Sequence, residues 1–447
     1  MPSLTRLILT ILLFVLPHMA AGQGSAAWVV SWTAAAHGPY PSGNASAQPD
    51  QRFAFPSPPV GANDQTFRLI VRPSLWGQQA RLRLTNVFGT RPVTFDGVYV
   101  GLQLGGAALV KGTNHPVRFA GEDSVTVAAG ASVVSDPVEL AFVPDAAAEP
   151  ANLSGRKLAV SFHVVGESGP MTWHAKALQT SYVSPPRSGS KGAAEDEAAF
   201  PYSTASWFFL DALDMLAPAG SFAVVAFGDS ITDGTASTMN GDDRWPDVLA
   251  RRLQAVYANR VAVVNSGIGG NQVVGPAEYS AQKPFLGGPS ARMRIDRDVI
   301  ELAGVSAMIW LEGINDFSRN GNASVASVAD GMRDVVGRIR AKRPQLRVFG
   351  ATVLTALGAA NAAHGFPEQD QKRRALNDFI RTSGLFDGVI DFDRVTFDPQ
   401  SGGLKGEFIP ESTTGGAGDK LHPNRAGYLA MGMSIDLALV APSLAGR

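Results

Sequence analysis

A serine stands where an apolar segment gives way to a polar turn. Ser230 lies in VVAFGDSITDG, residues 224–234, in which the apolar run has the character of a strand. A serine at the end of a strand and the start of a helix lies beside backbone N–H groups that attract negative charge, which suits a nucleophile. The same position is also typical of a helix N-cap, which does no chemistry. The role of Ser230 therefore depends on whether the chain supplies a base.

One histidine has a carboxylate at a useful spacing. His422 lies in GDKLHPN, three residues after Asp419 and directly before Pro423. Within a turn, this spacing lets the carboxylate bind one ring nitrogen and leaves the other free to take a proton. Of the seven histidines, five precede residue 200 and His364 lies in a predicted loop. We expect the fold to bring His422 to Ser230; the alternative is an ordinary polar surface turn.

Two further segments could supply the hydrogen-bond donors that an oxyanion needs. NSGIGGNQ follows the second predicted strand and contains Gly267, Gly269 and Gly270, while EGIND follows the third and contains Asn315. Glycines after a strand commonly form turns, and an asparagine there commonly caps a helix or closes a turn. Together with Ser230, however, these residues occupy the ends of three successive strands. Which of the three glycines would donate is left open.

Charge and composition narrow the function classes. The chain has 447 residues, with 38 basic and 39 acidic side chains and no long block of like charge. This balance argues against a nucleic-acid partner. The chain has no cysteine, which excludes thiol nucleophiles, thiolate metal sites and disulfides. The pattern implies no cofactor and no metal.

The N-terminus has the pattern of an export signal. Arg6 precedes the apolar stretch LILTILLFVL, and MAAG follows it as a small-residue cleavage region. About ten apolar residues are far fewer than the roughly 20 that span a bilayer, so an uncleaved anchor is the less favoured alternative. We expect residues 1–24 to be a signal peptide, with cleavage near residues 22–26. The mature protein is then secreted or periplasmic, without a stable membrane anchor.

The first half of the mature chain, residues 27–217, alternates with a period of two. TFRLIVR and ARLRLTNVF place apolar and charged side chains on opposite faces, as half-buried strands require. The polar segment 185–199 predicts a loop, and SWFFLDALDML after it predicts a buried strand. We expect a domain of the β-sandwich or jelly-roll kind.

Residues 219–445 instead alternate strands with helices. SFAVVAF, VAVVN, VSAMIWL, LRVFGATVL and GVIDF predict five short buried strands. DDRWPDVLARRLQAVY predicts a helix with Leu249, Leu253 and Val256 on one face. A final helix is expected to begin at Pro423, with one side formed by Leu429, Met433, Leu437 and Val440. The alternation predicts a doubly wound α/β/α parallel sheet with ligand sites at the carboxyl ends of its strands.

Four segments resemble the sequence blocks of the SGNH/GDSL serine hydrolase family. GDSITDG, NSGIGGN, GIND and DKLHPN resemble its blocks in the expected order, within residues 219–445. The resemblance implies a flavodoxin-like three-layer sheet, with Ser230 as nucleophile, His422 as general base and Asp419 as its orienting carboxylate. It further implies an oxyanion hole made of the Ser230 N–H, Gly270 and Asn315.

Three segments of the first half, WVVSWTAAA, RLTNVFGTRPV and SWFFL, resemble a β-rich region that precedes the catalytic domain in some secreted members of this family. A scaffold that shapes the cleft is favoured over a glycan-binding module. The expected activity is hydrolysis of carboxylic esters, with small-molecule esters or acetylated carbohydrates as substrates. The alternatives are a lysophospholipase or arylesterase, an acyltransferase, and an inactive glycan-binding protein.

Two long loops, after Gly270 and after the fourth strand, are expected to wall the pocket. Tyr279, Phe285 and Phe317 are candidates for lining it.

Overall fold

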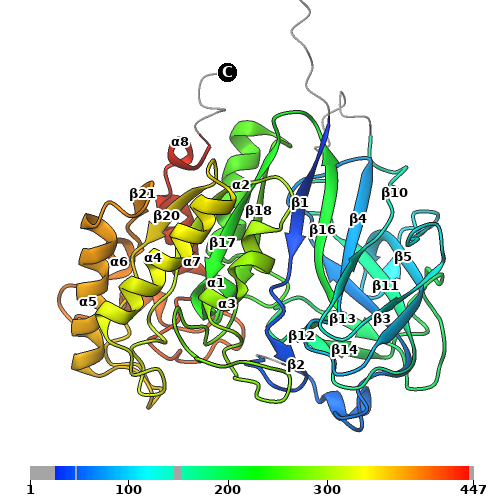
Figure 1. Ribbon diagram of the computed structural model, residues 1–447, viewed down its shortest axis with the longest axis horizontal. Helices are drawn as coiled ribbons and strands as arrows, with labels where there is room; N and C mark the ends of the chain where they lie inside the picture. Colours follow the sequence, from blue (N-terminus) through cyan, green and yellow to red (C-terminus); the bar gives the residue numbers. More distant parts are fainter. Residues whose placement is uncertain (1–25, 46–47, 145–152, 442–447) are drawn as a thin grey trace, which may run out of the picture.

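The computed structural model describes residues 26–45, 48–144 and 153–441 (Figure 1). The predicted signal peptide and its cleavage region therefore lie outside the described residues. Two parts of different architecture lie side by side in Figure 1, a β-rich part drawn in blue to green and an α/β part drawn in green to red. The second part begins with the strand at Phe222.

The β-rich part is built from antiparallel sheets. One sheet has the order β1-β16-β4-β10, with β9 beside β4. A larger sheet has the order β14-β13-β3-β11-β5-β6, with β7 and β8 beside β5, and a small third sheet has the order β15-β12-β2. The strands of the first sheet are β1 (Ala27–Thr33), β4 (Gln79–Thr85), β9 (Ser132–Val134), β10 (Val138–Glu139) and β16 (Leu210–Ala217). Those of the larger sheet are β3 (Asn63–Val71), β5 (Val93–Gly105), β6 (Ala108–Leu109), β7 (His115–Pro116), β8 (Ser124–Val127), β11 (Leu158–Glu167), β13 (Ser181–Val183) and β14 (Tyr202–Thr204); those of the third are β2 (Gly38–Pro39), β12 (Thr172–His174) and β15 (Trp207–Phe208).

The period-two pattern in β4 separates a buried face from a charged one. Leu82 and Leu84 are fully buried. Arg81 on the other face binds Asp214 of β16 at 2.8 Å, and Arg83 lies 2.7 Å from Asp211. Cross-strand pairs of opposite charge add to the stability of an antiparallel ladder. The prediction of an antiparallel β-rich first half is confirmed.

The predicted loop at residues 185–199 contains no helix or strand. It is anchored by Arg68, a fully buried residue of β3. The guanidinium of Arg68 donates to the backbone carbonyls of Ala194 and Asp196, the latter at 3.1 Å. SWFFLDALDML after the loop is predicted as one buried strand. It instead provides two, β15 and most of β16, which lie in different sheets.

The α/β part contains a parallel sheet of five strands in the order β18-β17-β19-β20-β21. Numbered within this part, the order is 2-1-3-4-5, which is the flavodoxin-like order, so this prediction is confirmed. All five predicted strands are present: β17 (Phe222–Gly228), β18 (Val261–Gly267), β19 (Val305–Leu311), β20 (Arg347–Ala351) and β21 (Gly388–Ile390).

Helices cover both faces of the parallel sheet. Side chains of α2 and α7 pack with Val224 and Ile309 on one face, whereas those of α4 and α5 pack with Val225 and Met308 on the other. Alternate residues of each strand thus enter different layers, as a three-layer fold requires. The helical segments are α1 (Ser230–Asp233), α2 (Trp245–Tyr257), α3 (Ala291–Ile295) with a π-helical turn at Asp296–Ile300, α4 (Val325–Lys342), α5 (Pro367–Thr382), α6 (Phe392–Thr396), α7 (Arg425–Ser434) and α8 (Leu437–Val440), with short 3-10 turns at Gln51–Phe53 and Gly406–Phe408.

Two predicted helical faces are wrong in part. In α2, Leu249 and Leu253 are buried, but Val256 is 60% exposed near the end of the helix. The predicted final helix is two helices, and α7 begins at Arg425 rather than at Pro423.

Its buried face is also displaced from the predicted one. Leu429 and Met433 are about half exposed, at 50% and 54%, while Tyr428 and Met431 are fully buried. The predicted spacing of four agrees with the helical period, but the buried stripe begins one position earlier, which corresponds to a rotation of roughly 100° about the helix axis. Asn424 caps the helix by accepting from the amides of Ala426 and Gly427, and this cap sets where the helix begins.

The two parts share one hydrophobic core. The same cluster contains Phe67 and Leu82 of the antiparallel sheets and Val225 and Trp310 of the parallel sheet. In Figure 1, β1 lies between β16 and the parallel sheet. Its Thr33 hydroxyl donates to the carbonyl of Asn265 in β18 at 3.0 Å. The β-rich part is therefore packed directly against the strand ends where a site is expected.

Candidate active site

Ser230 and His422 meet although 192 positions separate them. The Ser230 Oγ lies 2.8 Å from the His422 Nε2, within hydrogen-bonding reach. Ser230 is the first residue of α1, two positions after the last residue of β17. The cap of this helix is Asp229, whose side chain accepts from the amide of Ile231 at 3.0 Å. The alternative that Ser230 serves as the N-cap is therefore wrong, and its hydroxyl is available to the imidazole.

Asp419 holds the other side of the imidazole. Its Oδ2 lies 2.6 Å from the His422 Nδ1, and its Oδ1 accepts from the backbone amides of Leu421 and His422, both at 2.9 Å. Burial acts to raise the pKa of Asp419, but the hydrogen bonds from His422 and the two amides outweigh it and hold the pKa well below its ordinary value. The ionised carboxylate accepts from Nδ1–H, so Nε2 is left to accept the serine proton.

The loop that carries His422 is fixed on both sides. The amide of Asn424 donates to the carbonyl of Phe408 at 2.8 Å, and the cap that Asn424 provides anchors the start of α7. Before the histidine, the carbonyl of Asp419 accepts from the amide of Ala360 at 2.9 Å. The loop after β20 therefore supports the loop that presents the imidazole.

Hydrogen bonding separates the three candidate glycines. The amide of Gly267 donates to the side chain of Asn265 at 2.9 Å, and that of Gly269 donates to the Asp233 Oδ2 at 3.0 Å. Among the described residues, no acceptor is recorded for the amide of Gly270. Gly270 also has a φ of +84°, a conformation that favours glycine. Of the three, Gly270 is thus the one with an N–H available to a ligand.

Asn315 and the amide of Ser230 complete the set of predicted donors. The Asn315 Nδ2 donates one hydrogen to the carbonyl of Asn271 at 3.0 Å, which orients the side chain and leaves its second hydrogen free. In the described part of the chain, the Ser230 N–H has no recorded acceptor either. Ser230, Gly270 and Asn315 all line one pocket together with His422. The arrangement can stabilise an oxyanion that forms next to the serine.

Buried ionisable groups hold the loop after Gly270. Asp316 accepts from the amides of Val273 and Val274 at 2.9 and 3.0 Å. Burial raises the pKa of Asp316 to about 7. Arg294 donates to the side chain of Asn271 at 2.7 Å and to the carbonyl of Gly228 at 2.8 Å. These contacts join the ends of β17, β18 and β19 into one rigid site.

The pocket has a volume of about 340 Å³, and ten of its lining residues carry a polar side chain. Of the predicted lining residues, only Phe285 lines it. The Tyr279 hydroxyl donates to the carbonyl of His37, and its ring contacts Phe88 in the β-rich part. Phe317 is buried in the core. The lining residues are Asn44, Lys176, Ser230, Gly269, Gly270, Gln272, Phe285, Leu286, Gly287, Asn315, Ser318, Asn320, Asn361, Ala363, His364, Leu421 and His422.

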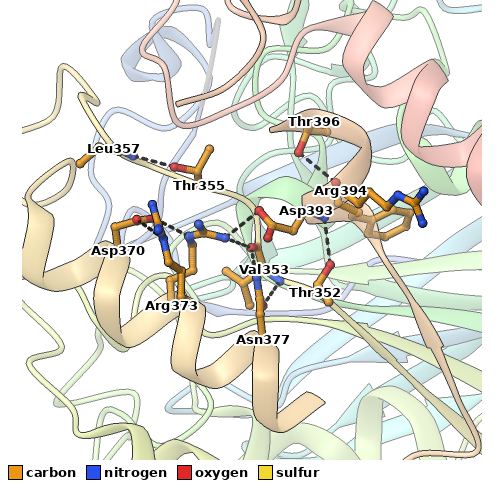
Figure 2. A network of polar contacts seen from close by, with 12 residues as sticks. Thr352, Val353, Thr355, Leu357, Asp370, Arg373, Asn377, Asp393, Arg394 and Thr396 are labelled. Carbon is orange, nitrogen blue, oxygen red and sulfur yellow. Dashed lines mark hydrogen bonds and ion pairs between the residues drawn. The ribbon is translucent and has the colours of Figure 1, made fainter. Parts of the chain in front are cut away.

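The loop after β20 forms one wall, as predicted, through Asn361, Ala363 and His364. Its start is fixed by the buried network of Figure 2. There Arg373 binds the carboxylates of Asp370 and Asp393, each at 2.7 Å, and the carbonyl of Val353 at 3.0 Å. Sequence reasoning noted His364 only as a loop histidine, although its place in a predicted wall loop was a usable signal.

Asn44 and Lys176 come from the β-rich part and were not predicted. Lys176 is buried, and its ammonium donates to the hydroxyl of Thr235 just after α1. Neither residue lies in a motif, and a period-two pattern does not indicate which side chain crosses to another part of the fold. Only the folded arrangement reveals them.

In the described ranges, no group of three or more His, Asp or Glu side chains is placed to hold a metal ion. None of the described helices is long and apolar enough to cross a membrane.

Residues 226–430 match the model of the GDSL-like Lipase/Acylhydrolase family. This part of the chain, which contains Ser230, Gly270, Asn315, Asp419 and His422, is therefore a GDSL-like acylhydrolase domain, and the predicted family is confirmed. A search of curated proteins finds no match to the sequence.

Several solved structures are similar to about half of the chain. One is Est24, a carbohydrate acetylesterase from Sinorhizobium meliloti, at 14% identity and a TM-score of 0.37, covering 50% of this chain and 99% of that one. Another is a lipase/acylhydrolase from Enterococcus faecalis, at 20% identity and a TM-score of 0.36, covering 51% and 96%. A third is an aryl esterase of M. smegmatis, at 18% identity and a TM-score of 0.37, covering 50% and 100%.

Three substitutions test the site. We predict that Ser230→Ala and His422→Ala abolish hydrolysis of p-nitrophenyl acetate, and that Asn315→Ala lowers kcat by about 10²–10³, which corresponds to the loss of one oxyanion donor. Circular dichroism and thermal melting should show folded proteins. Ser327→Ala, an exposed position on α4, is the matched control and should keep full activity. Undiminished activity of the Ser230 or His422 variant would refute the assignment.

His364 predicts a pH dependence of stability. Its pKa is lowered to about 4, first because burial disfavours the charged ring and second because His422 adds positive charge nearby. The unfolded chain binds this proton below about pH 6.5, and the folded protein does not until about pH 4. As the pH decreases through this range, the free energy of unfolding should therefore fall more steeply in the wild type than in His364→Gln. Urea titrations at pH 7.5, 6 and 5 measure this, and a constant difference between the two proteins would contradict it.

Proposed function

We propose that the protein is an exported serine ester hydrolase that removes short acyl groups, with acetyl esters of carbohydrates as its substrates. One observation carries the proposal: the Ser230 Oγ lies 2.8 Å from the imidazole of His422, whose other nitrogen is bound by Asp419. A hydroxyl, a base and an orienting carboxylate in this order make up the relay that activates a serine for attack on an acyl group.

The proposed reaction has two halves. His422 Nε2 takes the Ser230 proton as Oγ attacks the ester carbonyl, and the oxyanion is held by the N–H groups of Ser230 and Gly270 and by the amide of Asn315. The imidazolium then gives its proton to the departing alcohol, which leaves an acyl-enzyme on Oγ. In the second half His422 takes a proton from a water molecule as the water attacks the acyl carbonyl. The bond between the acyl carbon and Oγ then breaks, the imidazolium returns the proton to Oγ, and the acid is released.

The lining of the pocket supports a short acyl group. Apart from the glycines, four of the lining residues are apolar, namely Phe285, Leu286, Ala363 and Leu421. A long acyl chain gains about 0.8 kcal/mol per methylene only where it is buried against apolar surface. The other lining side chains carry amides, such as that of Asn320, hydroxyls and imidazoles. Such groups suit sugar hydroxyls better than lipid.

Export is proposed from the sequence of the first two dozen residues alone. Expression of the full chain in a bacterial host should yield protein in the periplasm or medium whose N-terminal sequence starts between residues 22 and 26. Protein that stays in the cytosol with Met1 intact would contradict export and would leave the hydrolase proposal standing.

A panel of p-nitrophenyl esters from C2 to C16, with acetylated xylan alongside, tests the substrate class. We expect kcat/KM to be highest at C2–C4 and to fall steeply beyond, and we expect acetate release from xylan. A maximum at C8–C16 would indicate a lipase or lysophospholipase instead. Ester products formed with an added alcohol, in place of free acid, would indicate an acyltransferase. Binding to xylan without turnover of any ester would indicate a glycan-binding protein.

A further inference from the structure

The loop that carries Gly270 is bound by side chains of the β-rich part. We propose that Asn44 and His174 are positioning residues of the oxyanion hole, so that the β-rich part is a working component of the catalytic site and more than a scaffold beside it. The proposal rests on the proposed ester hydrolysis, because it assigns these residues a role in stabilising the oxyanion.

Asn44 holds the peptide group between Gly269 and Gly270. Its Nδ2 donates to the carbonyl of Gly269 at 2.9 Å and reaches the carbonyl of Leu286 at 3.4 Å. The carbonyl of Gly269 and the N–H of Gly270 belong to the same planar peptide group and point in opposite directions. A hydrogen bond that fixes the carbonyl therefore also aims the N–H of Gly270 at the pocket.

Asn44 and Gly270 also lie very close together. A Cβ placed on Gly270 would lie 2.8 Å from the Asn44 Nδ2. The absence of a Cβ on Gly270 therefore leaves room for the Asn44 side chain, which orients the Gly270 N–H. The β-rich part provides this contact, because Asn44 lies between its strands β2 and β3.

A second contact holds the amide of Gly269. This N–H donates to the Asp233 Oδ2 at 3.0 Å, and the Asp233 Oδ1 lies 3.1 Å from the Nε2 of His174 in β12. The His174 Nδ1 lies 2.9 Å from the carbonyl of Ala35. Both ring nitrogens thus face acceptors, as an imidazolium requires. The side chains of His174 and Asp233 are only 5% and 3% exposed, so the pair is shielded from solvent.

The charge state of His174 agrees with this geometry. Burial acts to lower the pKa of His174, but the charge and hydrogen bond of Asp233 outweigh it, so the pKa lies above its usual value. A charged hydrogen bond between buried partners is stronger than a neutral one. Asn44 and the His174–Asp233 pair therefore fix the two peptide groups of Gly269, one on each side, and leave the Gly270 N–H little freedom to rotate.

Contacts that only join two parts of a fold would produce a different result from contacts that position a catalytic group. Loss of a joining contact lowers the melting temperature and leaves kcat unchanged. Loss of a positioning contact lowers kcat at constant KM, because the oxyanion exists in the transition state and not in the bound ester. The two roles can therefore be separated by kinetics.

The experiment compares Asn44→Ala and Asn44→Asp with the wild type on p-nitrophenyl acetate. Asn44 is partly exposed, so both variants should fold. We expect kcat to fall about tenfold in Asn44→Ala, part of the 10²–10³ that a lost oxyanion donor costs, with KM within about twofold. Asn44→Asp should fall further, because its carboxylate cannot donate and adds negative charge where the oxyanion forms.

Asn114→Ala is the matched control. Asn114 is an asparagine of the β-rich part that donates its amide to the carbonyl of Gly192 at 3.0 Å, away from the pocket. Its kcat should equal that of the wild type. A wild-type protein that hydrolyses no ester would contradict the proposed function itself. An active wild type with kcat of Asn44→Ala unchanged, or with KM raised at constant kcat, would overturn the positioning role.

Discussion

The hydrogen bond between Ser230 and His422 is the contact on which the remaining architecture depends. The serine stands at the end of the first strand of a parallel sheet, and the histidine stands just before a helix near the end of the chain. They meet because a parallel sheet gathers the carboxyl ends of its strands at one edge, where loops from distant sequence converge. The buried arginine networks and the cap at Asn424 make this edge rigid, so the imidazole has one orientation toward the hydroxyl.

The β-rich part changes how the site is understood. It shares a hydrophobic core with the parallel sheet, and Asn44, His174 and Lys176 extend from it to the catalytic loops. A GDSL-like domain that folded without this part would leave Asp233 without its buried imidazole and the carbonyl of Gly269 without its donor. Stability and oxyanion stabilisation therefore depend on the same interface.

The sequence predicts a large share of this structure because its signals are local. The strands of the parallel sheet are short apolar runs. Three short motifs place their polar residues at strand ends, and a fourth places its residues before α7. The face of α7 was misassigned by one position, since the spacing of apolar residues does not show which of two adjacent stripes meets the sheet. The choice among three glycines needed hydrogen-bond partners, and Asn44 carries no local pattern at all. Contacts between parts of a fold are set by tertiary packing, which no window of the sequence contains.

Covalent labelling with a fluorophosphonate tests whether Ser230 is an activated nucleophile. Intact-mass and peptide mass spectrometry of the full-length protein should show one label per chain, located on Ser230. The rate of labelling should fall by orders of magnitude in His422→Ala, because the serine proton then has no acceptor. Absence of labelling in the wild type, a label on another residue, or an unchanged rate without the imidazole would contradict the account.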